Sequence, residues 1–330
     1  MKIKFRFAQS SMKILRGKFK FFSLGALLFF STLNAFAEEA TPPAPESRET
    51  NWEEALIQGN INISEWFDSF ADGLDLFLVG KRVTKRQNQT RINIETSFVT
   101  TEIEPFSSAA NLGFNLQLPN VEEYWSLKFS SYDEQQEQRN LKNAYLRTTP
   151  RQKSYGATVG LLANLGKVRT RFEPRIELQD PLKVSHSLTF DSIAKTKHFE
   201  INPELELYAN SDVGVGSVQS LNFYFRFTNI YSMTLLNQGN YEEKSHFYNV
   251  DNGISFGQVI DGSSGLSYNL IFNSNNRAHY HLESYNISLS YSKVLYKRIL
   301  DFQLIPNVDF AEDLGFKGVA GLTLNINLQF

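Results

Sequence analysis

The stretch Gly318-Val-Ala-Gly-Leu-Thr-Leu-Asn-Ile-Asn-Leu-Gln-Phe330 alternates in character along its whole length. Every second residue from Ala320 to Phe330 is apolar, and from Gly321 to Gln329 the residues between them are glycine, threonine, asparagine or glutamine. A period of two places these two sets on opposite faces of a β-strand. In a soluble sandwich the faces would meet a core and water, whereas in a membrane barrel they would meet lipid outside and a wet lumen inside.

The first 37 residues have the composition of a secretory signal peptide. An apolar run from Phe21 to Phe30 precedes Ala35-Phe36-Ala37, which has the small-residue pattern of a cleavage site. Met12 is an alternative start that leaves a signal of ordinary length. A membrane anchor is the other interpretation, but the apolar run is too short to span comfortably. We predict a signal peptide over 1–37 and export of the chain, because the segment has no acidic residue and carries the basic residues Lys2, Lys4, Arg6, Lys13, Arg16, Lys18 and Lys20.

Composition excludes several classes of protein. The chain has 33 basic and 35 acidic residues, so removing the basic signal leaves an acidic remainder that is not suited to nucleic acid. It has no cysteine, which excludes disulfides, thiolate metal sites and a lipoprotein anchor. The mean hydropathy of −0.31 is not that of a helical membrane protein, but it suits a barrel in which half of every strand faces water. With 28 Phe and 14 Tyr, a soluble β-sandwich would expose too many aromatic side chains.

Residues 38–90 read as a periplasmic linker with a short amphipathic helix. Pro42, Pro43 and Pro45 predict a flexible lead-in, and residues 51–58 could form two helical turns. In the stretch 64–73, capped by Ser64, the apolar residues Trp66, Phe67 and Phe70 share one helical face with Leu74. This helix would either pack at the periplasmic mouth of a barrel or act as a loose tether.

Two features resemble known outer-membrane proteins. The closing strand with its terminal Phe330 resembles the C-terminal signature of Gram-negative barrels, which the assembly machinery reads. Trp66-Phe-Asp-Ser-Phe70, the Asn88–Ile92 stretch and Leu304–Phe310 resemble a family of Gram-negative outer-membrane β-barrel proteins of uncharacterised activity. The resemblance implies an outer-membrane location, with membrane lipid and the assembly machinery as partners, and Phe330 as the assembly signal. It implies no catalytic residue.

The region 91–330 reads as an all-β, transmembrane antiparallel barrel. Alternating segments separated by turn residues predict fourteen strands, an even number as single-chain bacterial barrels require. The segment 141–149 has the poorest pattern. Without it the count is thirteen, an odd number, so a second segment would have to go as well, which gives twelve. No long loop is left over to form a plug. The predicted strands are 91–101, 110–118, 124–132, 141–149, 154–163, 167–178, 183–190, 198–209, 219–232, 246–258, 264–273, 280–296, 299–311 and 317–330.

The faces of these strands are predicted from parity. Outward positions are filled by Leu, Phe and Tyr, as in Leu221, Phe223 and Phe225, and tyrosines gather near strand ends, where interfacial girdles form. Inward positions are polar, and two strands are heavily charged. This charge ladder consists of Arg169, Arg171, Glu173, Arg175, Glu177, Glu200, Glu204 and Glu206. It is either the wall of a pore that selects solutes or an internal ion-pair network that holds a narrow lumen shut.

Histidines offer little support for catalysis or metal binding. Ser185 and Ser187 flank His186, but parity directs the histidine toward lipid and the serines inward, so no nucleophilic site forms. His279, His281 and Glu283 project to one side of a strand end and have a partial metal-site geometry. The simpler interpretation is an exposed polar rim. We therefore predict no enzyme activity, no metal and no cofactor.

These observations favour a small passive outer-membrane channel for small polar solutes or ions. A closed structural or partner-binding barrel with a salt-bridged lumen is the alternative. The inward positions are somewhat more acidic than basic, which predicts a mild preference for cations. The sequence predicts no nucleic-acid partner, and it leaves the solute and the oligomeric state open.

Overall fold

The computed structural model describes residues 57–65, 91–116, 125–147, 149, 151, 153–296 and 299–330. A helix spans residues 57–65, so Ser64 lies within a helix and not at its start. The side-chain amide of Asn60 donates to the carbonyl oxygen of Gln329 at 2.8 Å. The predicted signal peptide and most of the helical stretches predicted at 51–58 and 64–73 lie outside the described residues. Within the described ranges, no helix has the length and apolar character needed to cross a membrane.

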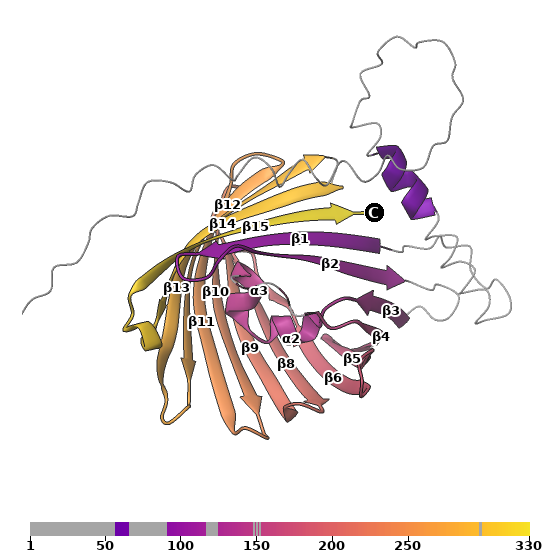
Figure 1. The fold of residues 1–330 in the computed structure, drawn as a ribbon, viewed down its shortest axis with the longest axis horizontal. Helices are drawn as coiled ribbons and strands as arrows, with labels where there is room; N and C mark the ends of the chain where they lie inside the picture. Colours follow the sequence, from indigo (N-terminus) through magenta and orange to yellow (C-terminus); the bar gives the residue numbers. More distant parts are fainter. Residues whose placement is uncertain are drawn as a thin grey trace, which may run out of the picture. The chain divides into compact units, whose positions relative to one another are not determined.

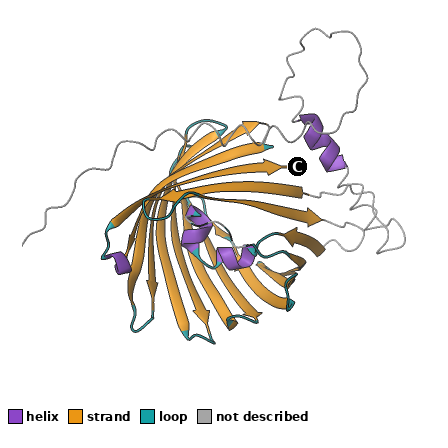
Figure 2. Ribbon diagram, viewed as in Figure 1, coloured by secondary structure: helices purple, strands orange, loops and turns teal. Residues whose placement is uncertain are grey.

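The rest of the described chain is almost entirely β-strand (Figure 2). Two short helices, α2 (Glu134–Gln138) and α3 (Leu141–Leu146), and one 3-10 turn, η1 (Glu312–Leu314), interrupt the strands. The strands are β1 (Arg91–Thr101), β2 (Ser107–Leu116), β3 (Trp125–Ser130), β4 (Gly156–Leu165), β5 (Val168–Glu177), β6 (Lys183–Ser192), β7 (Ala194–Lys195), β8 (Phe199–Asn210), β9 (Gly214–Arg226), β10 (Tyr231–Glu242), β11 (Phe247–Val259), β12 (Ser264–Asn275), β13 (His281–Tyr296), β14 (Leu300–Ala311) and β15 (Gly318–Gln329).

The strands close into an antiparallel barrel (Figure 1). Apart from β7, which pairs only with β8, each strand pairs with its neighbours in the sequence; β6 pairs with β8, and β1 pairs with β15. The two residues of β7 only extend the β6 side along β8, so the ring has fourteen strands. Closure removes the free strand edges, which satisfies the main-chain groups without water, as a lipid environment requires.

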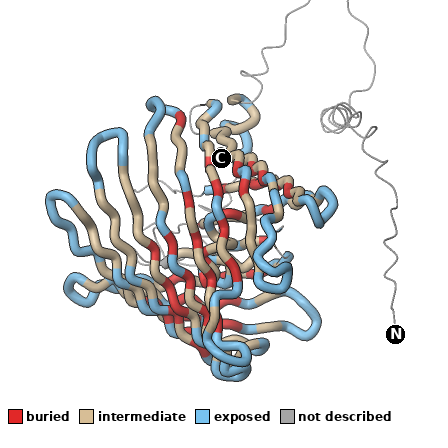
Figure 3. Tube along the Cα trace, turned by 90° about the vertical axis from the view of Figure 1, so that its left-hand side faces the viewer, coloured by how far each residue is buried: buried red, intermediate tan, exposed pale blue. Residues whose placement is uncertain are grey.

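Parity sets the two faces as predicted. On β15, Leu322 points outward and is 41% exposed, whereas Thr323 and Asn325 point into the barrel and are fully buried. On β5, Phe172 and Ile176 are exposed on the outer face. An apolar exterior around a polar interior is the arrangement of a transmembrane barrel. Figure 3 shows the exposed turns at the strand ends.

The predicted count of fourteen is confirmed, although two of its segments are wrong. Residues 141–149 do not form a strand, because Leu141–Leu146 is the helix α3. The predicted strand 219–232 covers most of β9, a turn and the start of a further strand, β10, which runs on to Glu242. The omission has a physical reason: Leu235 and Leu236 are adjacent and Asn237 faces outward, so the polar and apolar alternation fails there. The alternative count of twelve strands is excluded.

The barrel has two ends, which we name from the chain. The terminal end is where β1 begins and β15 ends, and the loop end is opposite. Connections at both ends are short, with one exception at the loop end between β3 and β4. This connection, residues 131–155, contains α2 and α3 and lies inside the ring of strands (Figure 1). We call it the inner segment, and it corrects the prediction that no loop is long enough to form a plug.

Candidate functional site

The inner segment folds locally because its sequence carries two helix caps. The Asp133 side chain accepts hydrogen bonds from the main-chain N–H groups of Gln135 and Gln136, at the start of α2. The Asn140 side chain accepts from the N–H of Asn143 at 3.0 Å, at the start of α3. Asp and Asn are favoured caps because their side chains satisfy N–H groups that lack a partner in the first turn. Helical turns therefore replace the strand predicted here.

Apolar side chains attach α3 to one side of the barrel. Leu146 is fully buried in a cluster with Ile271 of β12 and Ile305 of β14. Leu236 of β10 is also buried on the inner face, and a Cβ at Gly253 would stand 3.4 Å from both Leu236 and Ile271. Apolar residues at inward positions are unusual in this polar lumen. Their burial supplies a docking surface for the inner segment.

Ion pairs attach the inner segment to β1. Glu95 of β1 is buried and is paired with Arg147 and with Arg151, the latter at 2.8 Å. Glu137 of α2 completes the cluster, 2.7 Å from Arg151. The Arg151 guanidinium lies 3.9 Å from the ring centre of Tyr132. Burial raises the pKa of Glu137 above that of a free carboxyl, although the neighbouring arginines oppose the shift.

Arg175 of β5 joins the two ends of the inner segment. Its guanidinium donates to the Ser130 hydroxyl at 2.9 Å and to the Ser154 carbonyl at 2.5 Å, so one side chain joins the end of β3 to the residues before β4. A Cβ at Gly156 would stand 2.7 Å from this guanidinium, so glycine leaves the space that Arg175 occupies. Arg175 is only 2% exposed.

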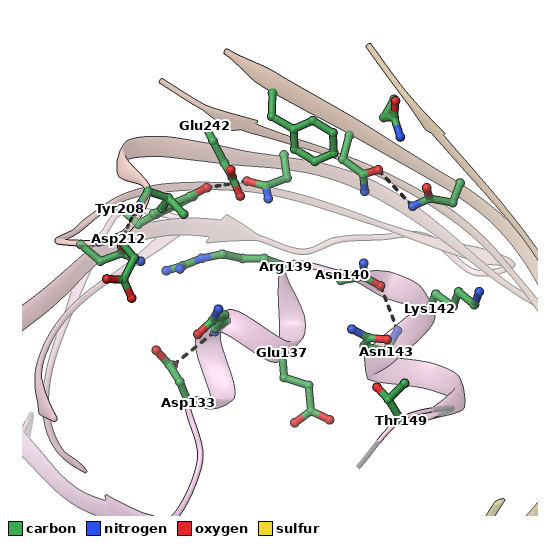
Figure 4. A pocket seen from close by; sticks show the side chains of 18 of the residues that line it. Asp133, Glu137, Arg139, Asn140, Lys142, Asn143, Thr149, Tyr208, Asp212 and Glu242 are labelled. Carbon is green, nitrogen blue, oxygen red and sulfur yellow. Dashed lines mark hydrogen bonds between the residues drawn. The ribbon is translucent and has the colours of Figure 1, made fainter. Parts of the chain in front are cut away.

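Further polar contacts reach around the ring. Arg139, the C-cap residue of α2, lies 2.6 Å from Glu206 of β8. Its guanidinium is 3.7 Å from the ring centre of Tyr208 on the same strand (Figure 4). Single contacts reach four other strands. They join Gln135 to Glu173 (3.0 Å), the Gln138 carbonyl to Gln238 (3.1 Å), the Leu141 N–H to Asp251 (3.0 Å) and Lys142 to Asp309 (2.6 Å).

The charge ladder lies where parity places it, but its partners differ from the simple cross-strand pairs expected. Arg169 pairs with Asp191 on β6, and Arg171 lies 3.1 Å from Glu173 of its own strand. The three glutamates of β8 do not pair with the arginines of β5, because β6 lies between the two strands.

Instead, Glu206 pairs with Arg139 of the inner segment, and Glu200 lies 2.5 Å from Lys195. Glu204 is in register with another carboxylate, Asp191. Glu177 lies 3.7 Å from Arg175. The Arg169 side chain, near the terminal end, is 59% exposed. The solvent exposure of the ladder residues therefore falls along β5 toward Arg175, which is buried beside the inner segment.

Two spaces in the lumen adjoin the inner segment. A vestibule of about 1290 Å³ opens at the loop end, where α2 and α3 form its floor and Asp212 and Glu242 lie on its wall (Figure 4). On the other side of α2 is a gap of about 50 Å³ against β5, β6 and β8. The gap is lined by Gln135 and Gln138 of α2 and by wall residues that include Arg171, Glu173, Arg175, Glu204 and Glu206. Five ladder residues therefore line the smaller of these two spaces.

His186 occupies the position that parity predicts, but the alternation assumed for His279, His281 and Glu283 does not hold, because His279 precedes β13 and Glu283 lies at a break in the register of that strand. His186 is exposed on the outer face, whereas Ser185 and Ser187 are buried inside. His281 Nε2 lies 2.8 Å from Glu312, and its Nδ1 lies 2.7 Å from the carbonyl oxygen of His279. Across the described chain, no three His, Asp or Glu side chains are grouped so as to hold a metal ion.

The inner segment was not predicted from the sequence, although two signals for it exist. Asp133 and Asn140 each precede a short run of helix-forming residues, and Leu236, Ile271 and Ile305 interrupt otherwise polar inward faces.

Phe330, the predicted assembly signal, lies at the end of the pairing between the first strand, β1, and the last strand, β15. Its N–H donates to the Ile92 carbonyl at 2.9 Å, and its carbonyl accepts from the Ile92 N–H at 3.1 Å.

Comparison with known proteins finds no matching family model and no curated protein of similar sequence. Solved structures do match. The outer membrane channel DcaP of Acinetobacter baumannii is 7% identical, with a TM-score of 0.45 over 74% of this chain and 97% of its own. A loop-deletion mutant of OmpT, an outer membrane protein of Vibrio cholerae, is 7% identical, with a TM-score of 0.44 over 74% and 99%. OccK11 of Pseudomonas aeruginosa is 8% identical, with a TM-score of 0.42 over 74% and 96%.

Proposed function

We propose that this protein is a passive channel for small polar solutes or ions, and that its narrowest point is the gap beside α2. The observation that carries the proposal is the position of that gap. It lies below the vestibule and is bounded by the charge ladder on one side and by the polar side chains of α2 on the other. Charged walls close together select among small solutes. A gap of about 50 Å³ accommodates only a few water molecules, so passage would be restricted to small species.

The apolar exterior supports a location in the outer membrane of a Gram-negative cell. In this proposal the terminal end and the N-terminal segment face the periplasm, and Phe330 is read by the assembly machinery. Membrane lipid surrounds the barrel. The proposal includes no catalytic step and no bound cofactor.

A closed barrel is the second candidate, and one observation favours it. The inner segment contacts strands around the ring, from Glu95 of β1 to Glu206 of β8 and Asp309 of β14. Such a segment could be a permanent plug. The two candidates differ in whether the unaltered protein conducts.

Single-channel recording in planar bilayers separates them. Gln138→Trp adds an indole to the gap side of α2 and should lower the conductance of the open channel, whereas Gln136→Trp adds the same group on the vestibule side and should have little effect. Both residues are exposed on a short helix, so neither change disturbs the core.

A third variant, in which residues 133–153 are replaced by a short Gly-Ser linker, should give larger conductance steps than the unaltered protein. If only this deletion conducts, the segment is a plug and the closed barrel is correct. If the two tryptophan variants change conductance equally, solutes do not pass beside α2. If no form conducts, the channel proposal fails.

A further inference from the structure

The outer face of the barrel carries a cluster of side-chain amides where apolar residues are expected. Gln219 of β9, Asn237 of β10 and Asn252 of β11 all point outward, because their neighbours Val218, Leu236 and Asp251 are buried inside. Asn237 is directly paired with Asn252, and Gln219 is paired with Gly239. The cluster therefore spans three adjacent strands, and we call it the amide patch.

The amide patch lies at the middle of the apolar belt. Each of its residues is near the centre of its strand. Toward the terminal end, the rings of Tyr231, Phe256 and Tyr268 lie in a row, with successive centroids 5.8 and 6.3 Å apart. Toward the loop end, Tyr241 is paired with Tyr248. Aromatic rows mark the two membrane interfaces, so the patch between them faces hydrocarbon.

Hydrocarbon cannot satisfy these amides. Asn237 is partly satisfied, because its Nδ2 donates to the Leu221 carbonyl at 3.0 Å. Gln219 and Asn252 are exposed, and in the described part of the chain their side chains make no hydrogen bond. A polar group without a partner in an apolar medium costs several kcal/mol. Threonine and histidine occur singly on other outward faces (Thr96, Thr170, His186), but no comparable group of amides occurs on the described strands.

We propose that the amide patch is the contact surface for a second copy of this chain. All copies enter the membrane in one orientation, so the symmetry axis of a dimer must run along the membrane normal. A two-fold axis in that direction brings the patch against itself at the same depth. An amide both donates and accepts, so each copy supplies the partner that the other lacks. The hydrocarbon tails of ordinary lipids have no hydrogen-bond donor or acceptor to offer these amides.

Cross-linking in membranes tests this proposal directly, because the chain has no cysteine of its own. Gln219→Cys and Asn252→Cys, each alone, should give a product of twice the chain mass with a short bis-maleimide. The control is Leu112→Cys, an exposed outward residue of β2 on the opposite side of the ring, which should give none. Unboiled gel mobility checks that each variant is folded.

A second variant tests whether the amides cause the contact. Gln219→Leu with Asn252→Leu makes the patch apolar, so the barrel should fold while its mass in detergent falls from two copies to one. Light scattering measures that mass. A cross-linked product of any other mass would show a different protein on the patch and overturn the proposal. No product at either position, or equal products at Leu112→Cys, would also overturn it.

Discussion

At the scale of the single residue, the contribution of a side chain to the stability of the barrel depends on the face of the strand that it occupies. Leu324 points outward at the middle of β15, and its neighbour Asn325 points inward. Leu324→Arg should destabilise the barrel by about 2–4 kcal/mol, because it puts a charge near the bilayer midplane. The free energy of unfolding in lipid vesicles measures this cost.

The control for that change has to come from another strand. Asn325 is fully buried and donates to Gln303 at 3.3 Å, so an arginine there would be overpacked and would not simply enter water. Ser292 of β13 is exposed on the inner face, and Ser292→Arg should cost much less. Equal costs for Leu324→Arg and Ser292→Arg would mean that the faces are assigned wrongly.

The charge ladder leads to a prediction about ion selectivity. Glu200→Gln with Glu204→Gln removes two negative charges from the inner face of β8, and Glu204 lines the gap together with Arg171. The preference of the channel should therefore move toward anions, and less so in high salt. Reversal potentials across a salt gradient measure the shift. We leave Glu206 unchanged because its loss would also release Arg139. The matched control is Glu243→Gln in an exposed turn, and the same shift there would rule out the ladder as its source.

At the scale of the element, the inner segment is held by two different kinds of contact. Leu146→Ala removes fully buried apolar atoms and should cost about 2–5 kcal/mol if the site does not collapse. Part of that cost should appear as opening of the segment. Trypsin added to intact membranes should then cut at Lys142, Arg147 or Arg151, while the unaltered protein is protected. Leu322→Ala on the outer face should leave the protection intact.

The ionic contacts make a separate prediction. Glu95→Gln leaves Arg147 and Arg151 with Glu137 as their remaining carboxylate, and so weakens the attachment to β1 without creating a cavity. We expect more frequent current fluctuations in bilayer recordings, with an unchanged amount of folded barrel. Recordings as quiet as those of the unaltered protein would show that the apolar docking surface alone holds the segment.

The strands were predictable because parity is a local property. Period-two alternation placed β5 and β15 and their faces correctly, since each outward residue meets the same surroundings along the whole strand. The pattern failed for β10, where Leu236 packs inside the barrel and Asn237 faces out. It also failed at Leu141–Leu146, because spacing within a loop does not show whether the loop folds back into a lumen.

The candidate site was predictable only in part, because parity shows which side chains face the lumen but not which loop fills it. Parity identified Arg175 and Glu206 as inward charges, but their contacts with Ser154 and Arg139 depend on where the inner segment lies. The gap exists only because a distant loop fills the rest of the lumen. Contacts between residues far apart in sequence leave no periodic signal.

At the scale of the whole molecule, the end of the chain completes the ring. Deleting Phe330 removes two main-chain hydrogen bonds to Ile92 and the proposed assembly signal. We expect less barrel with the shifted mobility of unboiled samples in outer membranes. Phe330→Tyr keeps the backbone and an aromatic ring, and should assemble normally. An unchanged amount of folded barrel after the deletion would contradict the role assigned to Phe330.

The pairing of β1 with β15 also determines when the barrel can close during synthesis of the chain. Its register runs from Asn93 opposite Gln329 to Thr101 opposite Gly321, so the first strand to be synthesised waits for the last. Such distant pairing is slow, and until it forms the sheet has two open edges that can recruit other chains. A chain interrupted at any later strand is therefore an open sheet and not a smaller barrel. Between the ribosome and the membrane, the newly made protein has to be kept apart from its own copies.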